Sequence, residues 1–233
     1  MDSRPGYDRK LLNILRTAAS VFAEKGYSRA SIRDISGATG VSLSGLYYYF
    51  GSKEELLYLI QDHCFATLLT RLEEDLEGVA DPECRLRIFV RNHLHFFVAN
   101  MEEMKVLSHE AEVLTGDFRS RILDKKRAYA GALAGILSEL REPEGGTGSE
   151  AVENALPPRG EGATLRATTF VLFGMMNWIY TWYDPERDLP VEELEQTILH
   201  LFLHGVLTPP APDGEVRLPE TSRMGRSSIW RGG

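Results

Sequence analysis

Hydrophobic residues recur at three- and four-residue spacing along most of the chain, which is the period of amphipathic helices. No segment shows the strict alternation that is typical of a strand. Serine caps and glycine or proline breaks divide the pattern into successive helices. The expected helices cover about residues 8–25, 32–39, 43–50, 53–77, 83–100, 102–115, 117–141, 163–183 and 191–207. The sequence therefore predicts an all-α fold.

Two segments lack this pattern. Residues 142–162 are rich in glycine and proline and have almost no large hydrophobic residue, so we expect a mobile loop there. Residues 208–233 show no period and are expected to be disordered. The helices themselves divide into a small first domain over residues 1–53 and a larger domain over residues 54–207.

The composition is that of an ordinary globular protein, with 43% hydrophobic and 26% charged residues. Two cysteines, Cys64 and Cys84, are too few for a disulfide scaffold. The polar first residues do not resemble a secretory signal. The longest uncharged run, between Arg166 and Asp184, is shorter than the roughly 20 apolar residues of a membrane span. A soluble cytoplasmic protein is expected.

Charge is distributed unevenly along the chain. The net charge is −8, yet residues 1–53 hold eight Lys or Arg and four acids, which makes this part +4. The rest of the chain therefore carries −12. A basic end on an acidic body is typical of a protein that meets phosphate at one end, although uneven charge is also common without that role.

The short helices over residues 32–39 and 43–50, joined at Gly40, form a helix-turn-helix pattern. On a helical wheel Leu43, Leu46 and Phe50 share one face of the second helix, which we expect to be inward. The opposite face carries Ser44, Gly45 and Tyr48, with Tyr47 and Tyr49 on the flanks. Such a helix suits the major groove of DNA. The alternative is that the three tyrosines are packing residues.

The stretch AASVFAEKGYSRASIRDISGATGVSLSGLYYYFGSKEELL resembles the DNA-binding domain of the TetR family of bacterial transcriptional regulators. The resemblance includes the Gly40-Val41-Ser42 turn and the Ser52-Lys53-Glu54 start of the fourth helix. Ser31 replaces the usual threonine, and Tyr49 replaces a frequent histidine.

This resemblance implies a nine-helix TetR-like fold, with a three-helix DNA-binding domain and a C-terminal ligand-binding and dimerisation domain. It also implies repression by a dimer on a palindromic double-stranded DNA operator, with release by a small-molecule effector. By position, the expected contacts to the DNA backbone are Ser31, Arg33, Ser42, Tyr47, Tyr49 and Lys53. The expected contacts to bases are Ser44, Gly45 and Tyr48.

The larger domain must supply a core and, by the resemblance, a ligand cavity. The candidate cavity residues are large apolar or aromatic side chains with a few polar groups: Phe65, Leu68, Leu72, Phe89, His93, Phe96, Phe97, Met104, Tyr129, Leu133 and Asn177. His93 and Asn177 need partners if buried, because they lie in apolar stripes. Each candidate could instead belong to the core.

The last two helices carry the candidate dimer face. Its expected members are Trp178, Trp182, Leu194, Ile198, Leu201 and Phe202. Packing inside one chain is the alternative.

The segment from Asn177 to Pro185, followed by Pro190-Val191-Glu192-Glu193-Leu194, is similar to a TetR subgroup that responds to acyl-CoA thioesters. This similarity implies a long-chain acyl-CoA or similar apolar acid thioester as the effector. Cations available for its anionic head are Arg85, Arg87, Arg91, Lys125, Lys126 and Arg127. The alternative is a multidrug-responsive repressor of an efflux gene.

Enzyme readings find little support. Ser42 and Ser44 miss the spacing of a hydrolase nucleophile elbow, and no phosphate-binding glycine loop is present. His200 and His204 are spaced for a shared metal ion, but no third ligand is evident. We expect no catalytic residue, metal or cofactor. A helical adaptor without a DNA role is the other rival.

Overall fold

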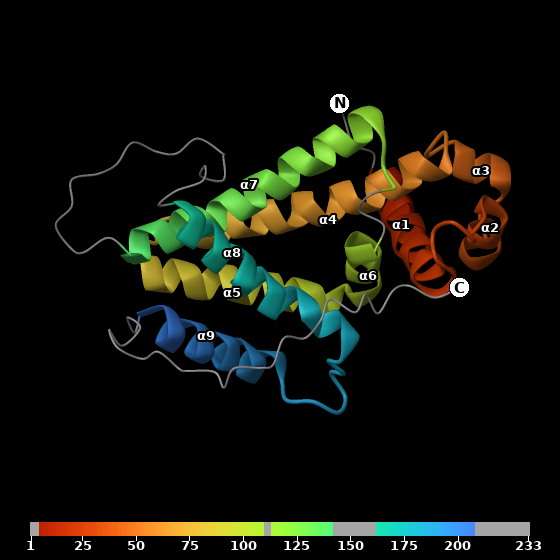
Figure 1. The fold of residues 1–233 in the computed structure, drawn as a ribbon. Coiled ribbons are helices and arrows are strands. Elements are labelled where there is room, and N and C mark those ends of the chain that lie inside the picture. Colours follow the sequence, from red (N-terminus) through yellow and green to blue (C-terminus); the bar gives the residue numbers. More distant parts are fainter. Residues whose placement is uncertain (1–4, 110–112, 142–161, 208–233) are drawn as a thin grey trace, which may run out of the picture.

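The computed structural model describes residues 5–109, 113–141 and 162–207, and these form nine α-helices and one 3-10 helix without a strand (Figure 1). The all-α prediction is confirmed. The expected loop over residues 142–162 lies outside the described residues, except for Gly162, which begins a helix. The expected tail over residues 208–233 also lies outside them.

The first three helices form the head of the molecule: α1 (Pro5–Lys25), α2 (Ile32–Thr39) and α3 (Leu43–Tyr47). A capping box begins α2, since the Ser31 hydroxyl accepts from the Asp34 amide and the Asp34 carboxylate accepts from the Ser31 amide. Gly40 ends α2 with a φ of 68°, a left-handed conformation that favours glycine. These local signals produce the compact turn between α2 and α3.

The remaining helices form the body: α4 (Lys53–Leu76), α5 (Pro82–Ala99), α6 (Met101–His109), α7 (Gly116–Arg141), α8 (Gly162–Asn177), the 3-10 helix η1 (Trp178–Thr181) and α9 (Val191–Leu207). In Figure 1, α4 and α7 run side by side, α9 lies along α5 on the other side of the body, and α8 crosses α5. The helix α4 begins in the head and continues along the body. It therefore connects the head to the body along the chain, and α6 of the body also packs against α1 of the head.

Three helices end earlier than the sequence predicts. The α3 helix stops at Tyr47 because a tight bond from the Tyr49 amide to the Leu46 carbonyl turns the chain toward Ser52, the cap of α4. The α8 helix stops at Asn177 and continues as η1. The α6 helix ends at His109, ahead of the undescribed residues 110–112.

One continuous hydrophobic core joins head and body. It runs from Ile14 and Phe22 in α1, through Leu56 and Ile60 in α4, to the apolar faces of α5 and α7. Because interiors are close-packed, a displacement of α4 in the body would also disturb its packing in the head. None of the described helices is both long and apolar enough to cross a membrane.

Candidate DNA-binding and effector sites

The end of α3 and the turn that follows it present tyrosines to solvent. Tyr48 is 73% exposed and Tyr47 is also exposed, while Leu46 and Phe50 are buried beneath them. Tyr49 packs partly against the core and meets Tyr48 edge to face, with ring centroids 5.3 Å apart. The outward placement of Tyr47 and Tyr48 is difficult to explain by packing alone. The inward placement expected for Leu43 is wrong: it is 38% exposed, because it starts a five-residue helix at the rim of the head.

Ser31 and Ser42, two of the expected DNA contacts, cap the helices α2 and α3. The Ser31 hydroxyl donates to Asp34, and the Ser42 hydroxyl accepts from the Gly45 amide at 3.1 Å. Ser44 lies on the exposed side, with its hydroxyl 3.2 Å from that of Ser42. Arg33 is exposed on α2. A salt bridge from Lys25 and the bonds from Ser31 hold the pKa of Asp34 well below its usual range.

Gly45 is required by the packing of the turn itself. A Cβ at this position would come within 2.9 Å of a Val41 methyl and 3.1 Å of the Ser42 hydroxyl. Gly45 is also one of the expected base contacts, where the lack of a side chain lets the backbone come close to DNA. The turn between α2 and α3 imposes the same requirement from inside the protein.

Lys53 points into the head in this structure. Its ammonium donates to the carbonyl oxygens of Tyr27, at 2.9 Å, and Ala30, at 3.0 Å, and lies 4.4 Å from the centre of the Tyr27 ring. The expectation placed this ammonium on a DNA phosphate. The geometry instead gives it a role in fastening the start of α4 to the loop between α1 and α2.

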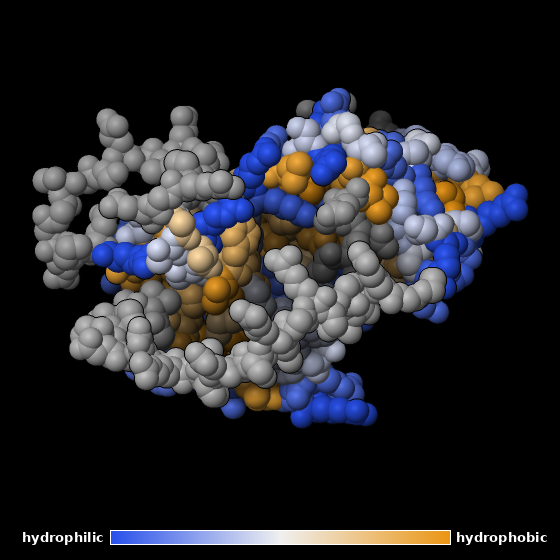
Figure 2. Space-filling model, viewed as in Figure 1, coloured by the Kyte–Doolittle hydropathy of each residue, from blue (hydrophilic) through white to orange (hydrophobic). Residues whose placement is uncertain are grey.

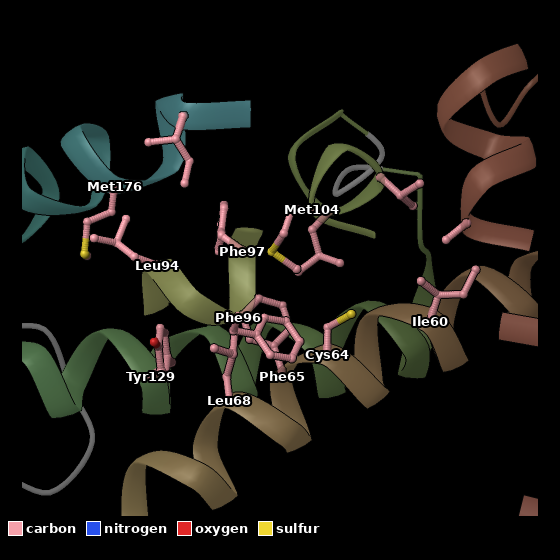
Figure 3. Packing of buried hydrophobic residues seen from close by; sticks show 14 of the residues in the cluster. Ile60, Cys64, Phe65, Leu68, Leu94, Phe96, Phe97, Met104, Tyr129 and Met176 are labelled. Atoms are coloured by element: carbon pink, nitrogen blue, oxygen red, sulfur yellow. The ribbon is translucent and has the colours of Figure 1, made fainter. Parts of the chain in front are cut away.

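The candidate cavity residues come together in the body. Ten of the eleven are buried, and Asn177 is half-buried at the end of α8. Figure 3 shows Phe65, Phe96 and Leu68 converging between α4 and α5, with Met104 approaching from α6. In the space-filling view of Figure 2, hydrophobic side chains lie in a recess between the α4–α7 and α5–α9 sides of the body. The residues predicted to line a cavity therefore meet in the interior of the body, and their role in binding an effector stays a prediction.

A small hollow lies nearer to the head. It is lined by Leu15, Arg16, Ile60, His63, Cys64, Phe96, Asn100 and Glu103, and its volume of about 10 Å³ admits about one water molecule. Burial raises the pKa of the Glu103 carboxyl and lowers that of His63. The hollow shares Phe96 with the predicted set and is too small for an organic effector.

Three of the predicted polar residues satisfy one another. His93 lies 3.3 Å from the Tyr129 hydroxyl through Nδ1 and 3.1 Å from the Asn177 side-chain oxygen through Nε2. Burial lowers the pKa of His93 to about 3, so the ring is neutral near pH 7. In that state Nε2 donates to Asn177 and Nδ1 accepts from Tyr129. The trio His93–Tyr129–Asn177 joins α5, α7 and α8 without a charge.

The candidate cations on α5 and α7 have different surroundings. Four form ion pairs: Arg85 with Glu139, Arg87 with Glu83, Lys125 with Asp62, and Arg127 with Asp124. Arg91 is exposed and near enough to Glu195 to lower the pKa of that carboxyl, which burial raises more strongly. Lys126 is half-buried and lies 5.8 Å from the centre of the Phe65 ring.

The candidate dimer residues separate into two groups. Leu201 is 61% exposed, and Trp178 and Trp182 are also exposed. Leu194, Ile198 and Phe202 are at most 5% exposed, so their expected place on the dimer face is corrected to the core of their own chain. The reason is that α9 packs this stripe against α5 and α8. Phe170 and Val171 on α8 are exposed as well, and sequence reasoning omitted both from the face.

The histidine pair on α9 does not form part of a larger metal-binding group among the described residues. The rings of His200 and His204 lie 4.1 Å apart, yet the described residues contain no group of three or more side chains suited to a metal ion. The Ser42 and Ser44 hydroxyls lie within hydrogen-bonding distance of each other, and the Ser42 hydroxyl also accepts from the Gly45 amide.

A head with an exposed helix-turn-helix surface, fused through α4 to a helical body, defines a DNA-binding regulator with a regulatory domain. The chain belongs to the TetR family of bacterial regulatory proteins, whose family model matches residues 14–58. The Tetracyclin repressor-like C-terminal domain model matches residues 79–148 and 160–206. The protein is therefore a transcriptional regulator rather than an enzyme.

Two relatives align with more than four fifths of the chain. The fatty acid metabolism regulator protein of Bacillus subtilis is 24% identical over 84% of this chain and 95% of its own length. The repressor KstR2 of Mycobacterium tuberculosis is 25% identical over 83% of this chain and 90% of its own. These relatives are transcriptional regulators of the same family.

Solved structures share the fold. A TetR-family regulator from Bordetella parapertussis has a TM-score of 0.72 and 29% identity, covering 86% of this chain and 97% of that one. AibR, solved with isovaleryl coenzyme A and operator DNA, has a TM-score of 0.67 and 24% identity, covering 82% of this chain and 97% of that one.

Proposed function

We propose that the protein is a repressor that binds a palindromic operator as a homodimer and leaves it when a long-chain acyl-CoA enters the body. The observation that carries the DNA-binding part is the exposed pair Tyr47 and Tyr48 above the buried Leu46. Hydroxyl-bearing aromatic side chains on a short helix can contact both base edges and phosphates in the major groove.

The homodimer is supported by the exposed apolar residues around the end of α8 and α9. Trp178, Trp182 and Leu201 are large hydrophobic side chains that one chain leaves in water. Clustered exposed apolar residues mark interaction surfaces. A two-fold partner that covers them would place two heads on the two half-sites of a palindrome.

The effector class rests on the apolar interior and on the relatives. Phe65, Phe89 and Phe97 belong to a set of aromatic side chains from adjacent helices, which suits a hydrocarbon chain. One relative is named a fatty acid metabolism regulator, and the AibR fold accommodates a coenzyme A thioester together with DNA. Because the candidate residues pack against one another, an acyl chain would have to separate helices. It would bind best to a conformation other than this one, and this preference is the source of regulation.

The helix α4 transmits the change. It carries Phe65 and Leu72 in the body and starts at Lys53 in the head. An acyl chain against Phe65 shifts α4, and the shift alters the separation of the two heads. A coupling of about 1–3 kcal/mol would weaken operator binding some 5–150-fold, and the operator would weaken effector binding by the same factor.

The test starts with an operator selected from random duplexes by the purified protein. Fluorescence anisotropy then follows its release by acyl-CoAs of increasing chain length, with free CoA and the free acids as controls. Release that grows with chain length supports the proposal. Equal release by free CoA contradicts the apolar site, and release by a polar drug alone places the protein among multidrug-responsive repressors.

Two variants test the DNA surface in the same assay. Tyr48→Ala is expected to reduce discrimination between operator and random DNA by about 1–3 kcal/mol for each lost base contact. Arg33→Ala is expected to weaken binding to operator and random DNA equally. It should also lower the slope of binding affinity against salt concentration by about one. Equal losses on both DNAs for Tyr48→Ala would remove it from the base contacts.

A further inference from the structure

Lys126 differs from the other candidate cations of α5 and α7. Arg85, Arg87, Lys125 and Arg127 each have an acidic partner, and Arg91 is exposed to water. Lys126 is half-buried, and among the described residues no acid forms an ion pair with it. Burial accordingly lowers the pKa of its ammonium.

An ammonium in this position is incompletely solvated. Removing a charge from water costs free energy unless a partner replaces the water. The Phe65 ring, 5.8 Å from Nζ, offers a weak cation–π attraction, which is smaller than an ion pair. An anion arriving beside Lys126 would gain a full charge partner in a partly desolvated place.

The position of Lys126 on α7 connects it with the predicted effector interior. Tyr129 and Leu133 follow it by three and seven residues, so all three share one face of the helix. Burial increases along this face, from the half-buried Lys126 to Tyr129 and Leu133, which are both buried. Lys126 precedes Tyr129 by about 4.5 Å along the helix axis. This face therefore has a charged outer end and an apolar inner end.

The buried polar trio cannot supply the positive charge. His93 is neutral because burial lowers its pKa to about 3, and its two ring nitrogens are engaged with Tyr129 and Asn177. These groups can meet an uncharged polar atom such as a carbonyl oxygen. An anionic group must be met elsewhere.

We propose, on the basis of the proposed function, that Lys126 is the anion anchor of the effector site. It binds a carboxylate or a phosphate of the effector, while the hydrocarbon part lies against Phe65 and toward Tyr129. The effector is therefore an amphiphilic anion with its charge at one end. Free fatty acids and acyl-CoA phosphates share this chemistry, and the experiment separates them.

The test compares dodecanoate, dodecanoyl-CoA and the uncharged dodecanol by isothermal titration calorimetry on the full-length protein. The variants are Lys126→Gln, Lys126→Arg and the matched control Arg127→Gln, whose side chain is exposed on the next position of α7. Lys126→Gln is expected to lower the affinity for the bound anion about tenfold or more. Its affinity for dodecanol should stay within about twofold of the wild type. Lys126→Arg retains most of the affinity, and Arg127→Gln resembles the wild type. If Lys126→Gln loses affinity for dodecanoate, the bound anion is a carboxylate. If it loses affinity only for dodecanoyl-CoA, the bound anion is a phosphate.

A second measurement tests the unpaired charge without any ligand. Lys126→Met keeps the apolar stem and removes the charge, so it is expected to raise the thermal midpoint of the free protein. A lower midpoint would show that the charge has a partner and would overturn the proposal. Equal weakening of dodecanol and the anions by Lys126→Gln would also overturn it.

The outcomes also separate this inference from the proposed function. Operator release by dodecanoyl-CoA that is unchanged in Lys126→Gln, together with unchanged affinity, overturns the anchor and leaves the proposed repressor mechanism intact. A wild-type protein that binds none of the three probes overturns both.

Discussion

Glu54 accepts two hydrogen bonds from Thr115, one from its amide and one from its hydroxyl, each 2.8 Å long. Thr115 directly precedes α7, whereas Glu54 lies in the first turn of α4. The preceding residue, Lys53, binds the carbonyls of Tyr27 and Ala30 in the head. Adjacent side chains at the start of α4 thus contact the body and the head. We expect a displacement of α7 to reach the head through them.

Removing the Glu54 contact is expected to uncouple the effector from the DNA. Glu54→Ala should reduce operator release by dodecanoyl-CoA, because the link between α7 and α4 contributes to the coupling. Residues between two sites typically change a coupling by about 0.5–2 kcal/mol, or about 2–30-fold in release. Operator affinity without effector should change little. The measurement is the operator dissociation constant with and without dodecanoyl-CoA.

Glu73→Ala is the matched control for this experiment, since Glu73 is exposed on the same helix. It should behave as the wild type. A Glu54→Ala protein with undiminished release would show that the coupling bypasses Thr115.

A second prediction concerns the turn of the head. Gly45→Ala should destabilise the protein by about 1–3 kcal/mol, because the new methyl would overlap Val41 and Ser42. Gly37→Ala is the control: nothing lies within 4 Å of a Cβ there, and the site is helical. It should stabilise α2 by about 0.5–1 kcal/mol. Urea unfolding measures both, and equal effects of the two substitutions would refute the packing role of Gly45.

The helix caps of the head could be predicted from the sequence because they depend on neighbouring residues. Contacts between residues far apart in the chain could not. Ser31, Gly40 and Ser42 each act within three residues of their own position, so the caps could be read from the sequence. The acceptors of Lys53 lie 23 and 26 residues earlier in the chain, and no spacing rule reveals them. From its position at the start of α4 alone, Lys53 is therefore expected on phosphate, and its contacts with the head are not foreseen.

The body shows a related limit. The stripe containing Leu194 and Ile198 correctly indicated that one face of α9 is buried, but periodicity does not tell which surface covers it. The structure assigns that stripe to α5 and α8 of the same chain. Likewise, the need of His93 and Asn177 for partners was evident from their apolar surroundings. Their hydrogen bond to each other depends on the packing of α5 against α8, which the sequence pattern does not reveal.

A third prediction separates two roles of Lys53. Lys53→Ala should lower the free energy of unfolding in the absence of DNA by about 1.5–3 kcal/mol, since two charge-assisted hydrogen bonds are lost. A lysine that touched only phosphate would leave this stability unchanged and lower the salt slope of DNA binding by about one. Urea unfolding and a salt titration of DNA binding, done on the same variant, distinguish the two roles.

A fourth prediction concerns assembly. Placing charge at two exposed positions, Leu201→Asp together with Trp182→Asp, should dissociate the dimer without unfolding the chain. Truncating one of the few central residues that dominate an interface typically costs about 2 kcal/mol or more, and tryptophan is frequent among them. Sedimentation velocity at micromolar concentration measures the result. Leu123→Asp, at a 37% exposed position on α7, is the control and should remain dimeric. A wild-type monomer, or a double variant that stays dimeric, would contradict the proposed face.

The last prediction uses the depressed pKa of His93. Between about pH 6.5 and 3 the unfolded chain binds a proton at this histidine and the folded chain does not. Stability therefore rises with pH across this window, is complete above the unfolded value, and falls as the pH drops toward the folded pKa, with a slope of up to about 1.4 kcal/mol per pH unit. Other groups titrate here too, so the measurement is the difference in unfolding free energy between the wild type and His93→Gln. Glutamine can bind Tyr129 and Asn177 without titrating, so the variant should gain stability relative to the wild type as the pH falls from 7 to 4.5. Parallel profiles for the two proteins would mean that the imidazole takes up a proton in the folded state, and that the trio opens in acid.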